Sequence, residues 1–204
     1  MTGGMSLPPE RPPTDPASIP SGVVVDTSVV SAIGRSDADK NRAVAKLFTT
    51  ADATACAPPC VIDELESDDA KAYDAPVQVL HGEQQGWMER VPAFTDGAQY
   101  RNGPVASRVA DRVRGRMADR FDRPEHEVET TDTLLPGVAV QLLASGEYDR
   151  VGVLLKDRHA AEAAHAVLKN TEYEELIRVY RGKPFIEFAV EWAGNEYSYD
   201  REIY

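Results

Sequence analysis

The sequence predicts a three-layer α/β/α fold with a mostly parallel central sheet. Short apolar runs typical of buried strands alternate with longer stretches in which apolar residues recur at helical spacing. Two of these runs, Val23–Val25 and Val151–Leu155, are β-branched or aliphatic, and an aspartate follows each of them within two residues. Because strands that alternate with helices pair in parallel, helices are expected on both faces of the sheet.

The first part of the chain is predicted to form two strands and three helices. Thr27 and Ser28 are favourable residues for starting a helix, and Gly34 is expected to break it. The pair Pro58-Pro59 suits another helix start, because proline is tolerated in the first turn. In order, the predicted elements are a strand at Val23–Val25, helices at Thr27–Ile33 and Asn41–Thr49, a strand at Ala53–Ala57 and a helix from Pro58 to about Asp69.

The second part is predicted to contain a segment of mixed pattern, one long helix, three shorter helices and two further strands. The segment Val77–Val91 has a mixed pattern that fits a strand and a helix. From Pro104 to Phe121, apolar residues recur every four positions and so occupy one face of a helix. The remaining predicted elements are helices at Thr131–Ala144, His159–Leu168 and Pro184–Trp192 and strands at Val151–Leu155 and Leu176–Tyr180.

One domain with an extension at each end is expected from the length and composition. Residues 1–21 are rich in proline and glycine and are predicted to be a disordered arm. The domain itself is predicted to span residues 22–185. Residues 186–204 are predicted to be the end of a helix and a polar tail that contains tyrosines.

The overall charge is strongly acidic. The chain has 34 acidic and 22 basic residues, a net charge of −12 and a mean hydropathy of −0.39. Such an excess of acids with few lysines resembles the surfaces of proteins from salt-loving organisms. No apolar stretch approaches the ~20 residues of a membrane span, and Cys56 and Cys60 lack the partners of a zinc site. A cytoplasmic location is therefore predicted.

Asp26 directly follows the first predicted strand. Ligands of open α/β sheets bind outside the carboxyl ends of the strands, so an acid at this point indicates a site. The alternative interpretation is that Asp26 only caps the next helix. Asp157 follows another predicted strand, and in a parallel sheet both acids would lie at the same edge.

Two further acids are expected at that edge. Glu64 and Asp132 each lie early in a predicted helix, and helix N-termini favour carboxylates. Either acid alone is unremarkable in a first helical turn. Four carboxylates at one edge would repel one another, and a divalent cation such as Mg²⁺ would relieve the repulsion. Metal-activated water would then attack a phosphodiester.

The order of these motifs resembles the PIN domain family. The matching pieces are Val23-Val24-Val25-Asp26-Thr27-Ser28, Pro59 with Glu64-Leu65, Asp132-Thr133-Leu134-Leu135-Pro136-Gly137-Val138-Ala139 and Leu154-Leu155-Lys156-Asp157-Arg158. The resemblance implies a ribonuclease that depends on Mg²⁺ or Mn²⁺, with Asp26, Glu64, Asp132 and Asp157 as catalytic, metal-binding acids. It favours Glu64 over its neighbour Asp63, because Leu65 after it matches the family pattern. Ser28 is predicted to support these acids.

Many PIN domains are toxins of the VapBC toxin–antitoxin pairs. The resemblance therefore implies RNA as substrate, an antitoxin protein and a second copy of the chain as partners, and, with the acidic composition, a halophilic archaeon as source. Two features depart from the pattern. Leu155 stands where the family usually has serine or threonine. Whether the site binds one metal ion or two is therefore left open. The stretch between Glu64 and Asp132 is long, so an RNA-processing role stands beside the toxin role.

Four arginines recur every four residues on the long helix and so line one side of it. They are Arg108, Arg112, Arg116 and Arg120. They are predicted to guide RNA phosphates, or else to form an ordinary solvated face with Asp111 and Asp119 as partners. His159 is predicted either to contact a phosphate or to pack against its neighbours.

Two other functions remain as alternatives. One is a PIN-like module that binds RNA or protein without cleavage, for which Leu155 is the argument. The other is a phosphatase of the haloacid dehalogenase type, which needs a second acid where this chain has Ser28.

Overall fold

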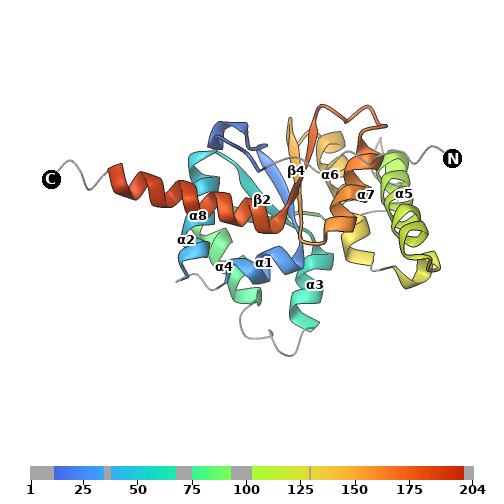
Figure 1. The fold of residues 1–204 in the computed structure, drawn as a ribbon, viewed down its shortest axis with the longest axis horizontal. Coiled ribbons are helices and arrows are strands. Elements are labelled where there is room, and N and C mark those ends of the chain that lie inside the picture. The colour runs from blue at the N-terminus through green and yellow to red at the C-terminus, as the bar shows by residue number, and fades with distance from the viewer. Residues whose placement is uncertain (1–11, 35–37, 68–74, 93–102, 129, 200–204) are drawn as a thin grey trace.

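The protein forms a five-stranded parallel sheet with helices on both faces (Figure 1). The computed structural model describes residues 12–34, 38–67, 75–92, 103–128 and 130–199. The strands are β1 (Gly22–Val25), β2 (Thr54–Ala57), β3 (Met88–Arg90), β4 (Val151–Leu155) and β5 (Ile177–Arg181). The helices are α1 (Thr27–Ile33), α2 (Asp39–Thr50), α3 (Pro59–Ser67), α4 (Ala75–Gln85), α5 (Gly103–Phe121), α6 (Thr130–Ser145), α7 (Arg158–Leu168) and α8 (Gly182–Tyr199), with 3₁₀ turns η1 (Pro16–Ser18) and η2 (Glu125–Glu127).

The helices form two layers around the sheet, as the predicted three-layer α/β/α class requires. Helices α1, α2 and α8 pack together on one face, whereas α6 and α7 cover the other and α5 packs against both of them (Figure 1). The β1 residues Val23 and Val24 are fully buried between the layers. On the α2 side, the ring of Phe48 packs against Trp87 and Phe185, each with ring centroids 6.0 Å apart.

The strand order creates a switch point beside β1. The order is β3-β2-β1-β4-β5, and all pairs are parallel. From β1 the chain builds outward to β2 and β3 on one side, and it later returns to place β4 and β5 on the other side. Ligands of such sheets bind where the winding reverses, at the carboxyl ends of the strands. That position lies between the ends of β1 and β4.

The element predictions differ from the structure mainly at their ends. The mixed segment resolves into α4 and β3. The helix expected to end at Trp192 continues to Tyr199, so the stretch from Asn195 to Tyr199 is helical and not a tail. After Pro184 in its first turn, α8 contains no further proline. A single glycine inside a helix, here Gly194, is tolerated. Phe121, predicted on the apolar face of α5, is exposed and packs edge-on against His159.

The predicted disordered arm also has a defined conformation in its described part. Residues 16–18 form η1, which is capped by the side chain of Asp15, and Ile19 is buried against the domain core. Apolar burial of Ile19 compensates part of the entropy that ordering this segment costs. Residues 1–11 lie outside the described residues, and the boundaries at 22 and 185 stay predictions.

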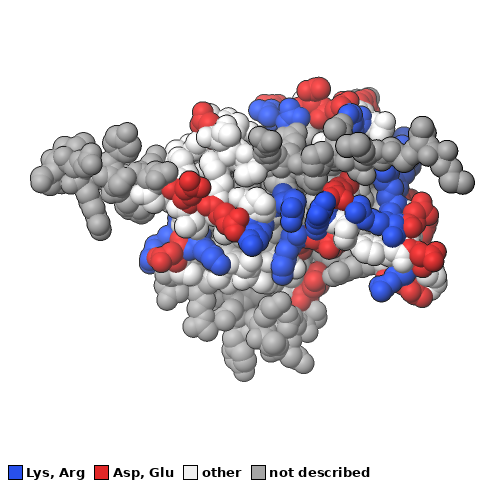
Figure 2. Space-filling view, viewed as in Figure 1, with Lys and Arg blue, Asp and Glu red and all other residues white. Residues whose placement is uncertain are grey.

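Basic side chains gather in a band on one face of this acidic protein. Figure 2 shows lysines and arginines running across the middle of the view, over the ends of β4 and β5, the start of α8 and the edge of α7 and α5. The carboxyl edge of the sheet therefore lies beside a surface of opposite sign to the net charge of −12.

Candidate active site at the carboxyl edge

Asp26 is held at the switch point by two backbone amides. It is only 4% exposed and follows directly from β1. One carboxylate oxygen accepts a hydrogen bond from the N–H of Ser28 at 3.2 Å, which caps α1, and the other accepts from the N–H of Lys156 at 3.1 Å. Asp26 therefore caps α1 with one carboxylate oxygen and binds the backbone that follows β4 with the other.

Glu64 is brought beside Asp26 by Thr27. The hydroxyl of Thr27 donates a hydrogen bond to Oε2 of Glu64 at 2.9 Å, although 37 residues separate them. Thr27 itself is buried in the first turn of α1, so its side chain has little freedom. This bond links the start of α1 to the second turn of α3 and sets the position of one Glu64 oxygen.

Asp157 and Asp132 lie at the same edge on the other side of β1. Asp157 caps α7 by accepting from the N–H of Ala160 at 2.7 Å and is half-buried. Asp132 is half-buried in the first turn of α6, a helix that packs against β1 and β4. Helix α6 begins at the carboxyl edge of the sheet and ends near the opposite edge, where β4 begins. Its first turn, with Asp132, therefore lies at the carboxyl edge.

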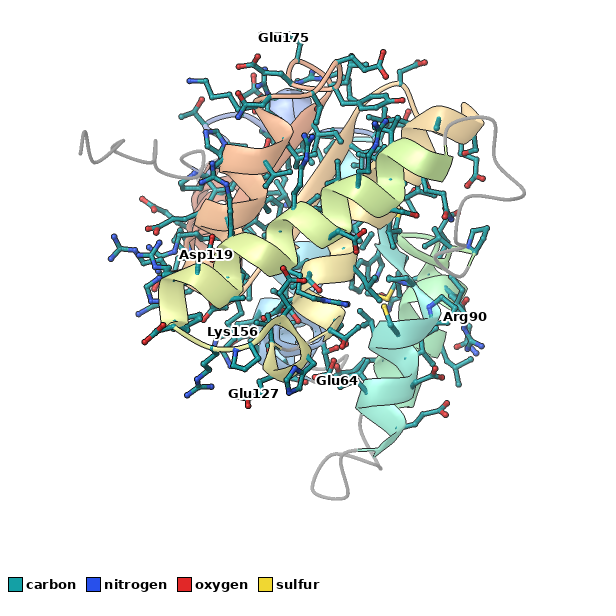
Figure 3. The ribbon with its side chains drawn as sticks, turned by 90° about the vertical axis from the view of Figure 1, so that its right-hand side faces the viewer. Glu64, Arg90, Asp119, Glu127, Lys156 and Glu175 are labelled. Carbon is teal, nitrogen blue, oxygen red and sulfur yellow. The ribbon has the colours of Figure 1, made fainter. Side chains whose placement is uncertain are left out.

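Side chains labelled in Figure 3 distinguish the two ends of the sheet. Glu64 and Lys156 both lie toward the lower end of the molecule, where β1 and β4 finish, and Glu175 lies at the upper end, before β5 begins. The sequence prediction that acids from separate motifs share one edge therefore agrees with the topology. The hydrogen bond from Thr27 to Glu64 and the bond from the Lys156 amide to Asp26 go further than that prediction.

A search against family models matches residues 19–192 to the halobacterial PIN domain. The chain belongs to the halobacterial PIN domain family. The searches of curated proteins and of solved structures gave no match. The family name agrees with the halophilic source predicted from composition, and it decides against the haloacid dehalogenase class.

This PIN domain carries a buried acid whose charge is costly. Burial raises the pKa of Asp26, the amides of Lys156 and Ser28 lower it in part, and the negative charge of Glu64 raises it again. A cation close to these two carboxylates would favour their charged forms. The site therefore has an electrostatic preference for a positive ligand.

The donor chemistry of the PIN domain's four acids suits a hard divalent cation. Mg²⁺ prefers oxygen ligands and binds through one or two carboxylates while it keeps several waters. Among the described residues, no three His, Cys, Asp or Glu side chains come together as a group that could hold a metal ion. Of the four acids, Asp26 and Glu64 have the strongest support as neighbouring carboxylates, because Thr27, the residue after Asp26, donates a hydrogen bond to Glu64.

The two cysteines of this PIN domain are unsuited to nucleophilic chemistry. Both are free, and burial raises the pKa of Cys56 to about 12 and that of Cys60 to about 11. A thiol must be deprotonated to act as a nucleophile. Cys60 lies one turn before Glu64 on α3, so it contributes packing at the edge of the site.

The arginine row on α5 lies on the surface. Arg108, Arg112, Arg116 and Arg120 are all exposed. Arg120 pairs with Glu162 of α7 at 2.6 Å, and Arg158 approaches the other oxygen of Glu162 at 2.7 Å. Between α5 and α7, Arg112 and Arg116 line a groove of about 700 Å³. The two middle arginines therefore share a groove with the acids Asp111, Asp119 and Glu125, and Arg120 is paired with α7.

Several contacts at the site carry no strong signal in the sequence. The role of Thr27 is one, although a hydroxyl residue directly after a strand-ending acid is a weak indication of it. Ser28 was predicted as a supporting side chain, and its described contact with Asp26 is through its backbone N–H. Leu155, the departure from the family pattern, is fully buried in β4.

The described part of the chain contains no helix long and apolar enough to cross a membrane.

Proposed function

We propose that this protein is a metal-dependent endoribonuclease that hydrolyses RNA phosphodiester bonds. The observation that carries the proposal is the clamped, buried Asp26 at the switch point with Glu64 beside it. Membership of the PIN family supports a nuclease, and the acidic edge accounts for why such a site would need a cation.

The proposed cofactor is Mg²⁺ or Mn²⁺, held first by Asp26 and Glu64, with Asp132 and Asp157 at the same edge as proposed further ligands that the described structure does not group with them. A bound divalent cation would supply an activated water and would offset charge on the departing oxygen. The protein's part is orientation. The amides of Ser28 and Lys156 fix the Asp26 carboxylate, Thr27 holds Glu64, and the cap bond to Ala160 fixes Asp157.

The arginine row is proposed to guide the RNA backbone toward the acids. Guanidinium groups suit phosphate oxygens, and these arginines are exposed beside a groove. Arg120 is the exception within the row, because its ion pair with Glu162 competes with a phosphate. We therefore assign the guiding role first to Arg112 and Arg116.

A cleavage assay tests the proposal. The full-length protein is incubated with single-stranded RNA and Mn²⁺ or Mg²⁺, alongside Asp26→Asn and a sample with chelator. We expect cleavage only by the unaltered protein with metal. Cleavage that persists in Asp26→Asn would contradict the mechanism.

A PIN module that binds RNA without cutting it is the second candidate. It is favoured by Leu155, a buried apolar residue at a position where the family usually has a hydroxyl. RNA binding without cleavage in the same assay would support this candidate.

The cellular role is proposed to be that of a toxin or of an RNA-processing enzyme in the cytoplasm. A toxin would have an antitoxin protein as partner and would act as a homodimer. A gene for a small DNA-binding protein next to this one would support the toxin, and its absence would favour RNA processing.

A further inference from the structure

A pocket with a lysine rim adjoins Asp26 on the α1–α8 face of the sheet. It has a volume of about 310 Å³, at the lower end of the size range of ligand sites. Its lining comes from α1, α2, α8 and the end of β4. The lining residues are Ser28, Val29, Ala32, Lys40, Lys156, Gly182, Lys183, Ile186 and Glu187.

The pocket shares two residues with the Asp26 clamp. Ser28 and Lys156, whose amides bond the two oxygens of Asp26, also line the pocket. A ligand in the pocket therefore touches residues that hold Asp26 in place. No residue of the pocket is one of the four acids.

The charge of the pocket is unusual for this chain. The sequence contains six lysines, Lys40, Lys46, Lys71, Lys156, Lys169 and Lys183, and three of the six line this one pocket. All three lysines are exposed, so their side chains form a basic rim around the pocket. Lys183 is paired with Glu187 at 3.7 Å, but both groups are well exposed, and such a pair is weak enough to exchange for a phosphate.

The floor of the pocket is apolar and rigid. Val29 and Ile186 are buried beneath it, and Gly182 brings the start of α8 against α1. A Cβ at Gly182 would lie 2.6 Å from a methyl carbon of Val29, so only glycine allows this approach. An apolar lining under a basic rim suits the two parts of a nucleotide, the base and the phosphate.

We propose that this pocket binds one nucleotide of a single-stranded RNA, next to the phosphodiester that is cleaved. The lysines contact the backbone phosphates, the base lies against Ala32 at the exposed edge of the apolar lining, and Glu187 accepts hydrogen bonds from the base or ribose. The inference rests on the proposed ribonuclease function, and it names the subsite that positions the substrate there.

Binding without cleavage tests the pocket. A fluorescent single-stranded oligoribonucleotide is titrated with full-length protein in chelator, and anisotropy gives Kd across a series of KCl concentrations. Lys40→Ala should weaken binding about threefold and lower the slope of log Kd against log salt by about 0.7. Lys169→Ala is the control, because this exposed lysine ends α7 at the opposite edge of the sheet.

A second variant fills the pocket without changing its charge. Ala32→Trp should raise Kd about tenfold and leave the salt slope unchanged, because it displaces the base. Ala17→Trp, at an exposed alanine before β1, is the matched control. Thermal unfolding of each variant establishes that it is folded.

The outcomes separate the pocket from the catalytic proposal. Loss of binding in Ala32→Trp and Lys40→Ala, with both controls unchanged, supports the pocket whether or not the protein cleaves RNA. Wild-type affinity in both folded pocket variants, or no RNA binding by the unaltered protein, overturns it. Cleavage that fails while this binding pattern holds would remove the nuclease proposal alone.

Discussion

At the scale of single residues, the site depends on an acid kept in an unfavourable place. Asp26 loses most of its hydration, and two backbone N–H groups restore only part of it. Thr27 then holds a second carboxylate within reach, and the negative charge of Glu64 adds to the cost. The energetic cost of these charges is offset when a cation or a substrate binds next to the carboxylates.

Replacing Thr27 should affect metal binding more than folding. In Thr27→Val the shape of the side chain is kept, but Glu64 loses its hydroxyl partner. We expect Mn²⁺ affinity, measured by calorimetry, to fall about tenfold, as is usual when a group that orients a metal ligand is removed. Thr27→Ser keeps the hydroxyl and should bind close to wild type. Equal affinity in Thr27→Val and wild type would show that Glu64 needs no such support.

At the scale of elements, the site is framed by two helix junctions. Helix α8 starts directly after β5, and Gly182 allows it to pack against Val29 of α1. On the other face, Glu162 of α7 pairs with Arg120 of α5, which joins the two helices, and also with Arg158 of its own helix. These two contacts hold the walls on either side of the β1–β4 switch point.

Two glycines of α8 should respond in opposite directions to alanine. Gly182→Ala places a Cβ against Val29 and should destabilise the protein by about 1–3 kcal/mol. Gly194→Ala meets no atom within 4 Å and should stabilise the same helix by about 0.5–1 kcal/mol. Urea unfolding of the two variants measures both effects. A neutral Gly182→Ala would mean that α1 and α8 separate easily.

The Glu162 junction should make stability depend on pH. Hydrogen bonds from Arg158, and then from Arg120, hold the pKa of Glu162 below its ordinary value of 4.5. The resulting stabilisation is fully present above that ordinary value and is lost as pH falls through the lower, folded-state pKa. Glu162→Gln should therefore cost about 1 kcal/mol at neutral pH and nothing once the acid is protonated.

Urea unfolding at neutral and acidic pH checks the Glu162 prediction. Glu174→Gln, at an exposed acid in the turn before β5, is the control and should change little at either pH. A Glu162→Gln penalty of the same size at both pH values would show that the charge is not the source.

At the scale of the whole molecule, charge is unevenly distributed. A net charge of −12 makes the surface repel itself, while basic side chains gather in a band on one face (Figure 2). Concentrated salt shortens the range of these forces from about 10 Å at 0.1 M to about 3 Å at 1 M. Salt should therefore favour the fold and disfavour contacts with phosphate.

Added KCl should raise the melting temperature. Screening of acidic self-repulsion between 0.1 and 2 M KCl is expected to give about 2 kcal/mol, or about 4–8 °C for a chain of this size. Calorimetry measures the shift, and sucrose at matched osmolality controls for exclusion of cosolute from the surface. A melting temperature that is unchanged or lower in KCl would show that the acidic surface is not the limiting factor.

The sequence by itself determined the class of fold and predicted the sheet edge at which the acids would lie. Buried strands such as Val151–Leu155 and helices with one apolar face are local patterns, and parallel pairing follows from their alternation. Asp26 and Asp157 could be placed at one edge because each lies within two residues of the end of a strand. Segment ends such as Tyr199 could not, since a helix continues as far as its surroundings allow.

Only the tertiary structure decided which groups touch. The bond from Thr27 to Glu64, the amide of Lys156 on Asp26 and the junction at Glu162 join residues that are 37, 130 and 42 positions apart. The lysine pocket likewise gathers four separate segments. Such contacts depend on how helices pack on the sheet, and packing is set by the whole core rather than by local pattern, so no single stretch of sequence encodes them.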